Sequence, residues 1–195
     1  MTDNFFAYIS RMSYITRWSL MRNAVPENIQ GHSHMVAVIA HALAAIRRDV
    51  LGVACDPNEY AAVALFHDAS EILTGDLPTP IKYHDAEITD AYRRVEAIAN
   101  EKLVAMLPED MRNAFAPLLM GETAEKYHDI VKAADKMSAY IKCIEERKAG
   151  NNEFISAEKQ TLKALKAYGM REVDYFLLNF MPAFEKTLDE LGTIE

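Results

Sequence analysis

Histidine and aspartate side chains occur in three separate segments of the chain where together they could hold one divalent cation. His67 and Asp68 lie within residues 60–73, a predicted helix with apolar residues on every side, and such a helix is expected to be buried. Burial of a carboxylate beside an imidazole is costly unless each has a partner, and a bound cation can serve both. His32 and Asp135 would add a second imidazole and a second carboxylate. Two nitrogen and two oxygen ligands suit manganese, iron, cobalt, nickel or zinc, and ligand type does not distinguish these metals.

Helical periodicity predicts that His32 and Asp135 lie near the core. His32 stands at the N-terminal end of an apolar stripe that includes Val36 and Leu43, so it is predicted to point inward. Asp135 lies at the margin of the apolar stripe in a predicted helix over residues 125–148, so it is predicted to be half buried. The other histidines are not expected to reach this site: His34 and His41 on the opposite helix face, and His84 and His128 at the surface.

A cation held in this way could support hydrolysis. Four protein ligands on an octahedral ion leave two positions, for water and for a substrate oxygen. Glu71 follows Asp68 at i+3 and His67 at i+4, so a helix would place its carboxylate on their side, where it could act on a water.

Each residue alone also has a structural interpretation. His67 and Asp68 could form a simple imidazole–carboxylate pair, and Asp135 could pair with Lys132 at i−3. Glu71 could form a salt bridge, and His32 taken alone is more typical of an ordinary core histidine. Only the combination favours a metal site over these alternatives.

The elements that must position these residues are predicted to be helices, because glycine and proline divide the chain into segments rich in Ala, Leu, Met, Glu and Lys. Neither a strand, a linker nor a repeat is predicted, so we expect an all-α fold in a single domain of residues 1–195. Asp56 followed by Pro57 predicts a helix start, and Pro182 should kink or split the last helix. Glycines mark the expected helix ends at Gly52, Gly75, Gly150 and Gly169. The predicted helices cover residues 4–14, 32–50, 57–73, 85–106, 109–119, 125–148, 152–168 and 171–191.

Composition and charge narrow the classes of partner. Half of the residues are apolar and 26% are charged, as in ordinary soluble proteins. The net charge of −8 disfavours nucleic-acid polymers and anionic membrane surfaces as partners, although a small anionic ligand remains compatible with a local positive site. Cys55 and Cys143 lack CxxC spacing, and the N-terminal segment lacks the pattern of a signal peptide, so we expect a cytoplasmic protein. The longest apolar stretch, residues 35–46, is too short to span a bilayer.

The spacing of these residues resembles a known enzyme superfamily. A histidine, a His-Asp pair 35 residues later, and an aspartate 67 residues after that pair resemble the HD-domain phosphohydrolases. Longer segments resemble the bacterial HD-domain 5'-deoxynucleotidases more closely, and they span nearly the whole chain. These are SRMSYITRWSLMRN (10–23), PENIQGHS (26–33), LFHDASEILTGDLPTPIKY (65–83), KAADKMSAYIKC (132–143), AGNNEF (149–154) and DYF (174–176).

The resemblance implies a single HD-type helical bundle with a buried central metal site. It also implies a cytosolic homodimer that removes the 5'-phosphate from deoxyribonucleoside monophosphates, with several bases accepted and one divalent transition metal per subunit. In this family pattern the metal ligands correspond to His32, His67, Asp68 and Asp135. Three of them, His32, Asp68 and Asp135, are also expected to contact the substrate.

The same resemblance assigns further roles near the metal. Glu71 corresponds to the catalytic carboxylate of the family. Arg17 corresponds to the catalytic residue that orients the phosphate, and Trp18 to a neighbour that contacts the substrate. The segment that contacts the nucleotide corresponds to Asp76, Leu77, Pro78 and Thr79. One departure is Gly31, which precedes His32 where a glutamate is expected, so a carboxylate that supports the metal ligands would be missing here.

The chemistry of these side chains agrees with such roles, although each has a simpler alternative. Arg17 offers a planar pair of donors matched to phosphate oxygens, or it is a solvated surface arginine. Asp76 could accept the 3'-hydroxyl of the sugar and crowd a 2'-hydroxyl, in a loop stiffened by Pro78 and Pro80, or it caps a turn. Trp18 could form a wall for sugar or base, or it belongs to the core.

Two other functions remain open from the sequence. Another HD phosphohydrolase, acting on nucleoside triphosphates or guanosine alarmones, would need more cationic residues than the predicted pocket loops offer, namely Arg17, Arg22 and Lys82. A non-catalytic helical module could instead hold a metal for regulatory or structural reasons, and it would tolerate the replacement of Glu71 by glutamine.

Overall fold

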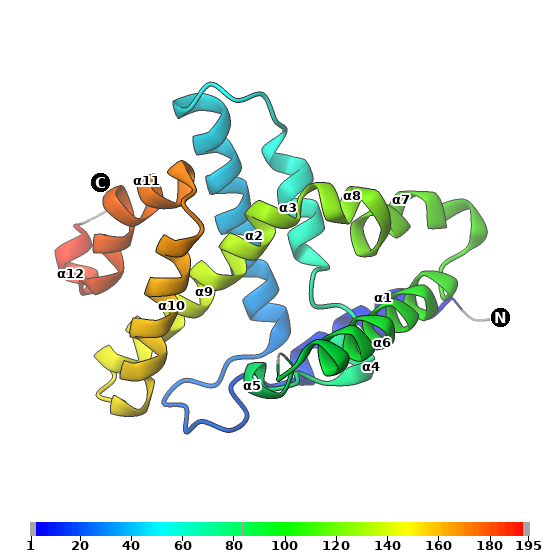
Figure 1. The fold of residues 1–195 in the computed structure, drawn as a ribbon, viewed down its shortest axis with the longest axis horizontal. Coiled ribbons are helices and arrows are strands. Elements are labelled where there is room, and N and C mark those ends of the chain that lie inside the picture. Colours follow the sequence, from blue (N-terminus) through cyan, green and yellow to red (C-terminus); the bar gives the residue numbers. More distant parts are fainter. Residues whose placement is uncertain (1–2, 83, 193–195) are drawn as a thin grey trace.

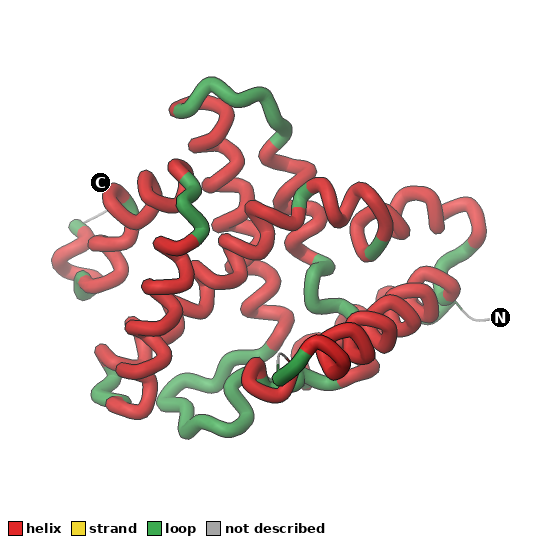
Figure 2. The backbone as a smooth tube through the Cα atoms, in the orientation of Figure 1, coloured by secondary structure: helices red, strands yellow, loops and turns green. Residues whose placement is uncertain are grey.

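A computed structural model describes residues 3–82 and 84–192, without the side chains of Thr79, Glu122, Thr123 and Glu125. Regular structure in these residues is helical, as Figure 2 shows. Within the same residues, the only pairing between extended segments is an isolated antiparallel bridge that joins Thr16 to Asn28. The predicted all-α fold is confirmed.

The larger group of helices surrounds the main hydrophobic core. Helix α2 packs against both α3 and α9, and α10 packs on α9 (Figure 1). The core lies between them and includes Leu43, Ile130 and Met137, each with essentially no exposed surface. The helices of this group are α2 (Ile29–Ala45), α3 (Pro57–Leu65), α9 (His128–Lys148), α10 (Ile155–Ala167) and α11 (Arg171–Asn179).

A smaller group of helices forms a second hydrophobic cluster near the N-terminal end of the chain (Figure 1). Phe5, Leu103 and Leu107 are buried in it. Its helices are α1 (Phe5–Ile9), α4 (Glu71–Thr74), α6 (Ala86–Ala105) and α7 (Glu109–Leu119). The remaining elements are α5 (Thr79–Lys82), α8 (Gly121–Lys126), α12 (Leu188–Leu191), three 3-10 turns at Ser10–Tyr14, Asn152–Phe154 and Met181–Glu185, and a π-helical turn at Ile46–Val50.

Side-chain caps explain where several helices begin. The side chain of Asn28 accepts a hydrogen bond from the backbone N–H of Gly31 and so starts α2. Asp56 accepts from the N–H of Asn58, with Pro57 in the first turn of α3, as predicted. The glycines predicted at helix ends all have positive φ: Gly52, Gly75, Gly150 and Gly169.

The predicted continuous helix over residues 57–73 is wrong. Helix α3 ends at Leu65, tight turns follow through Ser70, and α4 begins at Glu71. In these turns the backbone N–H of His67 donates to the carbonyl of Ala64 three residues earlier, at 3.4 Å. Leu65 is 44% exposed, so the segment is not buried on all sides. Local sequence favours a helix throughout, and tertiary packing overrides that preference.

Other helices begin or end within about one turn of the predicted residue, and some predicted helices are divided into two elements. The helix predicted over 32–50 begins at Ile29 and ends in the π-helical turn. The one predicted over 125–148 begins at His128, after the separate α8. The segments predicted over 4–14 and 152–168 each combine an α-helix with a 3-10 turn. Helices over 85–106 and 109–119 are confirmed, and Pro182 lies in the 3-10 turn that splits the last predicted helix.

One helical run, Ile29–Val50, is long and apolar enough to cross a bilayer by length and composition alone. The apolar stretch of residues 35–46 lies inside this run. However, 56% of its most apolar window is buried inside the fold. A core helix of a soluble protein passes the same test, so this run is weak support for a membrane span.

Candidate metal centre and active site

Four side chains predicted to bind metal come together from three parts of the fold. His32 comes from α2, His67 and Asp68 from the turns after α3, and Asp135 from α9. His32 Nε2 lies 3.0 Å from Asp135 Oδ1 and 3.6 Å from Asp68 Oδ2. One potential ligand atom from each of His32, His67 and Asp135 lies within 4.8 Å of the others. His32, His67 and Asp135 are therefore within mutual reach of one ion, and Asp68 lies beside them, with Oδ2 3.1 Å from His67 Nε2.

Hydrogen bonding around His67 shows that this donor set fits a cation. Its Nδ1 lies 2.7 Å from the carbonyl oxygen of Ala64, which can only accept, so Nδ1 carries a proton, and it is Nε2 that is free of one when the ring is neutral, the form that binds a metal. Nε2 then presents a lone pair. This atom is buried and has no hydrogen-bond partner among the described residues, although Asp68 Oδ2 lies 3.1 Å away. A lone pair facing a carboxylate oxygen is unfavourable in a buried site, so the two atoms need either a proton on Nε2 or a metal cation that takes its place.

The second histidine is also oriented by a neighbour. His32 is 1% exposed, and its Nδ1 lies 3.2 Å from Ser138 Oγ on α9. Ser138 follows Asp135 by one helical turn, so α9 supplies both a potential ligand and a group that orients another. His84 and His128 are exposed, as predicted, and His34 and His41, predicted on the opposite face of the helix, are exposed too.

Charge pairing dominates the electrostatics of the cluster. Burial lowers the pKa of His67, but the carboxylates of Asp68 and Asp135 outweigh burial and raise that pKa to about 9. Burial would raise the pKa of Asp68, whereas His67, His32 and Arg17 hold it well below its ordinary value. The pKa of Asp135 is lowered against burial by the same kind of neighbours, with the His32 hydrogen bond foremost. Asp135 is 34% exposed along its side chain, as predicted for a half-buried residue.

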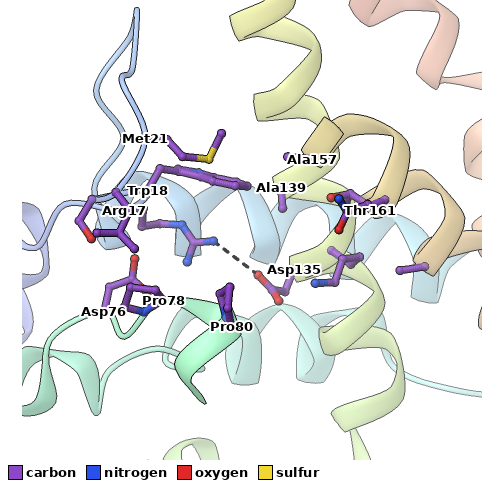
Figure 3. Close-up of a pocket in the computed structure, with 15 residues that line it drawn as sticks. Arg17, Trp18, Met21, Asp76, Pro78, Pro80, Asp135, Ala139, Ala157 and Thr161 are labelled. Atoms are coloured by element: carbon purple, nitrogen blue, oxygen red, sulfur yellow. Dashed lines mark ion pairs between the residues drawn. The ribbon is translucent and has the colours of Figure 1, made fainter. Parts of the chain in front are cut away.

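Arg17 lies inside this cluster and is not a solvated surface arginine. Its side chain is 14% exposed, with Nη1 3.3 Å from Asp68 Oδ2 and Nη2 3.9 Å from Asp135 Oδ1. Burial lowers the pKa of Arg17, but Asp135, Asp68 and Glu27 raise it above its ordinary value. The guanidinium therefore stays charged, and it points toward Asp135 across the cavity in Figure 3.

Glu71 is the first residue of α4 and is 5% exposed. In the described part of the chain it forms no salt bridge, and its buried Oε2 has no hydrogen-bond partner. Burial, followed by the charges of Asp68 and Asp76, raises the pKa of Glu71 to about 9. The predicted position on the same helix as Asp68 is wrong, yet the turn still brings the two carboxyl groups close enough to interact.

A cavity of about 660 Å³ opens beside these residues. Of the residues predicted to contact the substrate, Arg17, Trp18, Asp76, Pro78 and Asp135 line it, whereas His32 and Asp68 do not. Leu77 is half buried and does not line this cavity. The side chain of Thr79 is outside the described residues, so its predicted contact has no structural counterpart here.

Part of the cavity wall was not predicted from the sequence. In Figure 3 it is closed by Met21 beside Trp18, by Pro80 beside Pro78, and by α9 and α10. The residues from these two helices are Lys136, Ala139, Ala157, Gln160, Thr161 and Ala164. A spacing of three or four residues along α10 is the signal that could have found this face, although small side chains rarely mark a binding site.

The sequence matches the model of the 5'-deoxynucleotidase YfbR-like family over residues 4–184. The chain belongs to this family. The 5'-deoxynucleotidase of Erwinia tasmaniensis is 48% identical over 191 residues, which cover 97% of this chain and 96% of that protein. The 5'-deoxynucleotidase of Vibrio parahaemolyticus is 47% identical and covers 97% of this chain and 98% of its own. Membership in the YfbR-like family confirms the predicted family and the predicted class of enzyme, a phosphoric monoester hydrolase.

Solved structures show the same fold. An HD-domain phosphohydrolase from Listeria innocua has a TM-score of 0.79 at 24% identity and covers 93% of this chain and 88% of its own. The HD phosphohydrolase DatZ of cyanophage S-2L, bound to dA and one catalytic Zn²⁺, has a TM-score of 0.64 at 20% identity and covers 93% and 96%. The YfbR-like chain therefore has the HD-domain fold, as predicted.

The loop that carries Arg17 and Trp18 is attached to the C-terminal half of α9. The carboxylate of Glu146, which has no exposed surface, accepts from the backbone N–H groups of Ala24 at 2.8 Å and Val25 at 3.1 Å. It also accepts from Lys142 and from Asn151 Nδ2, at 2.7 Å for the latter. Asn151 belongs to the AGNNEF segment of the family resemblance. Through its hydrogen bond to Glu146, this segment helps to attach the Arg17 loop to α9.

Proposed function

We propose that this chain is a metal-dependent 5'-deoxynucleotidase that hydrolyses deoxyribonucleoside 5'-monophosphates to deoxyribonucleosides and phosphate. The observation that carries the proposal is the meeting of three potential metal ligands, with Asp68 and Arg17 next to them, beside one cavity in a member of the YfbR-like family. This combination favours the 5'-deoxynucleotidase over the two alternatives, a different HD phosphohydrolase and a non-catalytic metal-binding module.

His32, His67, Asp68 and Asp135 would hold one divalent transition metal per subunit. When bound, such a metal lowers the pKa of a coordinated water and screens the charge of phosphoryl oxygens. The buried Nε2 of His67, which faces Asp68 Oδ2 at 3.1 Å, supports this assignment. The mixture of imidazole and carboxylate leaves manganese, iron, cobalt, nickel and zinc as candidates.

Arg17 would bind the phosphate. Its Nη1 and Nη2 already face the carboxylates of Asp68 and Asp135. A phosphate beside those carboxylates could accept from both nitrogens, and such paired charge-assisted bonds are stronger and more specific than single ones. The substrate would thereby be oriented with its phosphorus toward the metal ligands.

Glu71 would act on protons in the reaction. Its buried carboxyl group has an oxygen without a partner and lies near Asp68 and Asp76. From there it could position the attacking water or give a proton to the leaving 5'-oxygen, a role worth about 10²–10⁴ in rate.

The sugar and base would occupy the cavity beyond Arg17. Asp76 lines the cavity and, in the described residues, forms no ion pair, so it can accept the 3'-hydroxyl. Trp18 provides a flat wall that contacts sugar or base without reading hydrogen bonds. Leu77, Pro78 and Thr79 complete the proposed nucleotide-contacting segment.

We also propose that residues 1–195 form one domain and that the enzyme is a cytoplasmic homodimer, as the family resemblance implies. The turn that carries His67 and Asp68 joins the two hydrophobic clusters, which supports the single domain. Light scattering after size-exclusion chromatography of the full chain tests the dimer: a monomeric mass would contradict it.

The experiment that tests the activity is phosphate release from matched deoxyribo- and ribonucleoside monophosphates, with and without chelator. We expect release from deoxynucleotides, its loss on chelation and its return with a divalent transition metal. Di- and triphosphates of the same nucleosides serve as the comparison panel, and elemental analysis of the purified protein identifies the metal. Faster turnover of triphosphates, or release that is unaffected by complete metal removal, would overturn the proposal.

A further inference from the structure

One carboxylate oxygen binds two neighbouring residues of the proposed substrate site. Oε2 of Glu27 accepts a hydrogen bond from Arg17 Nε at 3.1 Å and from the indole N–H of Trp18 at 2.9 Å. The Glu27 side chain is 18% exposed, and that of Arg17 is 14% exposed. Glu27 therefore contacts both residues proposed to face the phosphate and the sugar.

The backbone fixes where this carboxylate lies. The N–H of Arg17 donates to the carbonyl of Glu27 at 2.9 Å, and the N–H of Ile29 donates to the carbonyl of Ile15 at 3.0 Å. These bonds flank the bridge between Thr16 and Asn28. Because Glu27 stands directly across the bridge from Arg17, its side chain needs little freedom to reach both donors.

Trp18 adopts a backbone conformation that needs support. Its φ is 58°, in the left-handed region that bulky residues rarely adopt unless their surroundings hold them there. The N–H of Met21 and the side chain of Asn23 donate to its carbonyl, and its ring packs against Phe154 with centroids 5.2 Å apart. The hydrogen bond from the indole N–H to Glu27 then fixes the orientation of the ring.

We propose that Glu27 is a positioning residue that selects which edge of Arg17 faces the substrate and sets the direction of the Trp18 ring. With Nε bound to Glu27, the two terminal nitrogens of Arg17 are directed toward Asp68 and Asp135. Those nitrogens form the pair that matches two phosphate oxygens. This inference rests on the proposed function.

The test compares the metal-loaded parent with Glu27→Gln, which keeps the shape and removes the charge. Glu145→Gln is the matched control, because Glu145 is exposed on α9, close enough to Glu27 for their charges to interact, and bonded to neither Arg17 nor Trp18. For a deoxynucleoside monophosphate we expect Glu27→Gln to lower kcat/KM about tenfold, mainly through KM, and the control to stay within about twofold.

A spectroscopic measurement makes the test independent of turnover. Trp18 is the only tryptophan in the sequence, so tryptophan emission reports this site alone. We expect Glu27→Gln to shift the emission and to weaken the binding of inorganic phosphate by about tenfold, while Glu145→Gln changes neither. Glu27→Asp, which keeps the charge but is one methylene shorter, should resemble Glu27→Gln and provides a second variant if the first folds poorly.

A double-variant cycle separates positioning from a general structural role. In an Arg17→Lys background, which lacks the Nε donor, Glu27→Gln should lower kcat/KM by less than about twofold, because its partner is already altered. Equal losses in both backgrounds, or unchanged emission and phosphate affinity in both Glu27 variants, would overturn the proposal. Absence of phosphate release from the parent would instead refute the proposed function, and the emission and phosphate-binding results would still decide the role of Glu27.

Discussion

At the scale of single residues, the role of a side chain at position 31 follows from its place in the first turn of α2. Gly31 is the third residue of α2, is exposed, and donates its N–H to the capping side chain of Asn28. A Cβ atom here would meet only Asn28 Oδ1, at 3.6 Å. A glutamate at this position could bond back to the N–H of Asn28 and complete a capping box. The geometry favours this role over the predicted one beside the metal ligands.

Gly31→Glu should therefore stabilise the protein without changing the metal site. We expect a gain of about 1 kcal/mol in the free energy of unfolding, from better helix propensity, the cap and the helix dipole. Urea unfolding of the metal-free protein measures the gain, and Gly31→Ala isolates the propensity contribution. A tighter metal affinity with unchanged stability would instead support a carboxylate that assists the metal ligands.

Glu71→Gln tests the proposed proton transfer. The amide keeps the size of the side chain but cannot exchange a proton, so phosphate release should fall by about 10²–10⁴ while helix content and metal content are unchanged. Circular dichroism and elemental analysis provide those two controls. Unchanged phosphate release would remove Glu71 from the mechanism.

Asp76→Ala tests sugar selection. Loss of a charged hydrogen-bond acceptor and of its bulk should reduce the preference for deoxyribo- over ribonucleotides by about tenfold or more, measured as the ratio of kcat/KM values. Asp90→Ala, on the exposed face of α6, is the control. A variant of Asp76 as selective as the parent would refute this role.

At the scale of elements, the sequence predicts helices and their caps well but not where tertiary packing interrupts them. The Asp56-Pro57 start of α3 and the break at Pro182 follow from local chemistry, and periodicity correctly turns His32 inward. The turns at His67 could not be predicted, because every residue around them is compatible with a helix. The wall from α10 was missed since Ala157 and Ala164 carry no reactive group.

The link between the Arg17 loop and α9 should make the stability of the protein depend on pH. Burial would raise the pKa of Glu146, but Lys142 and the N–H groups of Ala24 and Val25 hold that pKa at about 2. A folded-state pKa below the unfolded value stabilises the protein above the unfolded pKa, and this stabilisation is lost as the pH falls toward 2. Glu146→Gln should therefore destabilise most at neutral pH.

Urea unfolding of the parent and Glu146→Gln at two pH values checks this sign. The difference in unfolding free energy should be smaller by about 1 kcal/mol at about pH 3.5 than at about pH 7. Glu145→Gln, at the exposed neighbouring position of α9, controls for loss of charge alone. If the difference in unfolding free energy were independent of pH, the partners of Glu146 would not lower its pKa in the folded protein.

At the scale of the whole molecule, the candidate metal centre lies where the two hydrophobic clusters meet. Val63 and Ala64 belong to the main core, and Ala69 belongs to the second cluster. The turn between them carries His67 and Asp68. Packing in both clusters therefore determines where these two side chains lie, so the site depends on the complete fold.

The same arrangement predicts that metal stabilises the entire fold and not only the turn. A ligand at one hundred times its Kd adds about 2.7 kcal/mol to the free energy of unfolding, which corresponds to a rise in Tm of about 5–10 °C for a chain of this size. Melting of the chelated protein and of the same protein with added zinc or manganese, followed by circular dichroism, measures the rise. Asp135→Asn, which removes one proposed ligand charge from α9, should reduce the shift itself, whatever its own Tm. Because one turn joins both clusters, we expect a single transition that moves as a whole, and a metal-dependent shift confined to part of the helical signal would show that the clusters unfold separately.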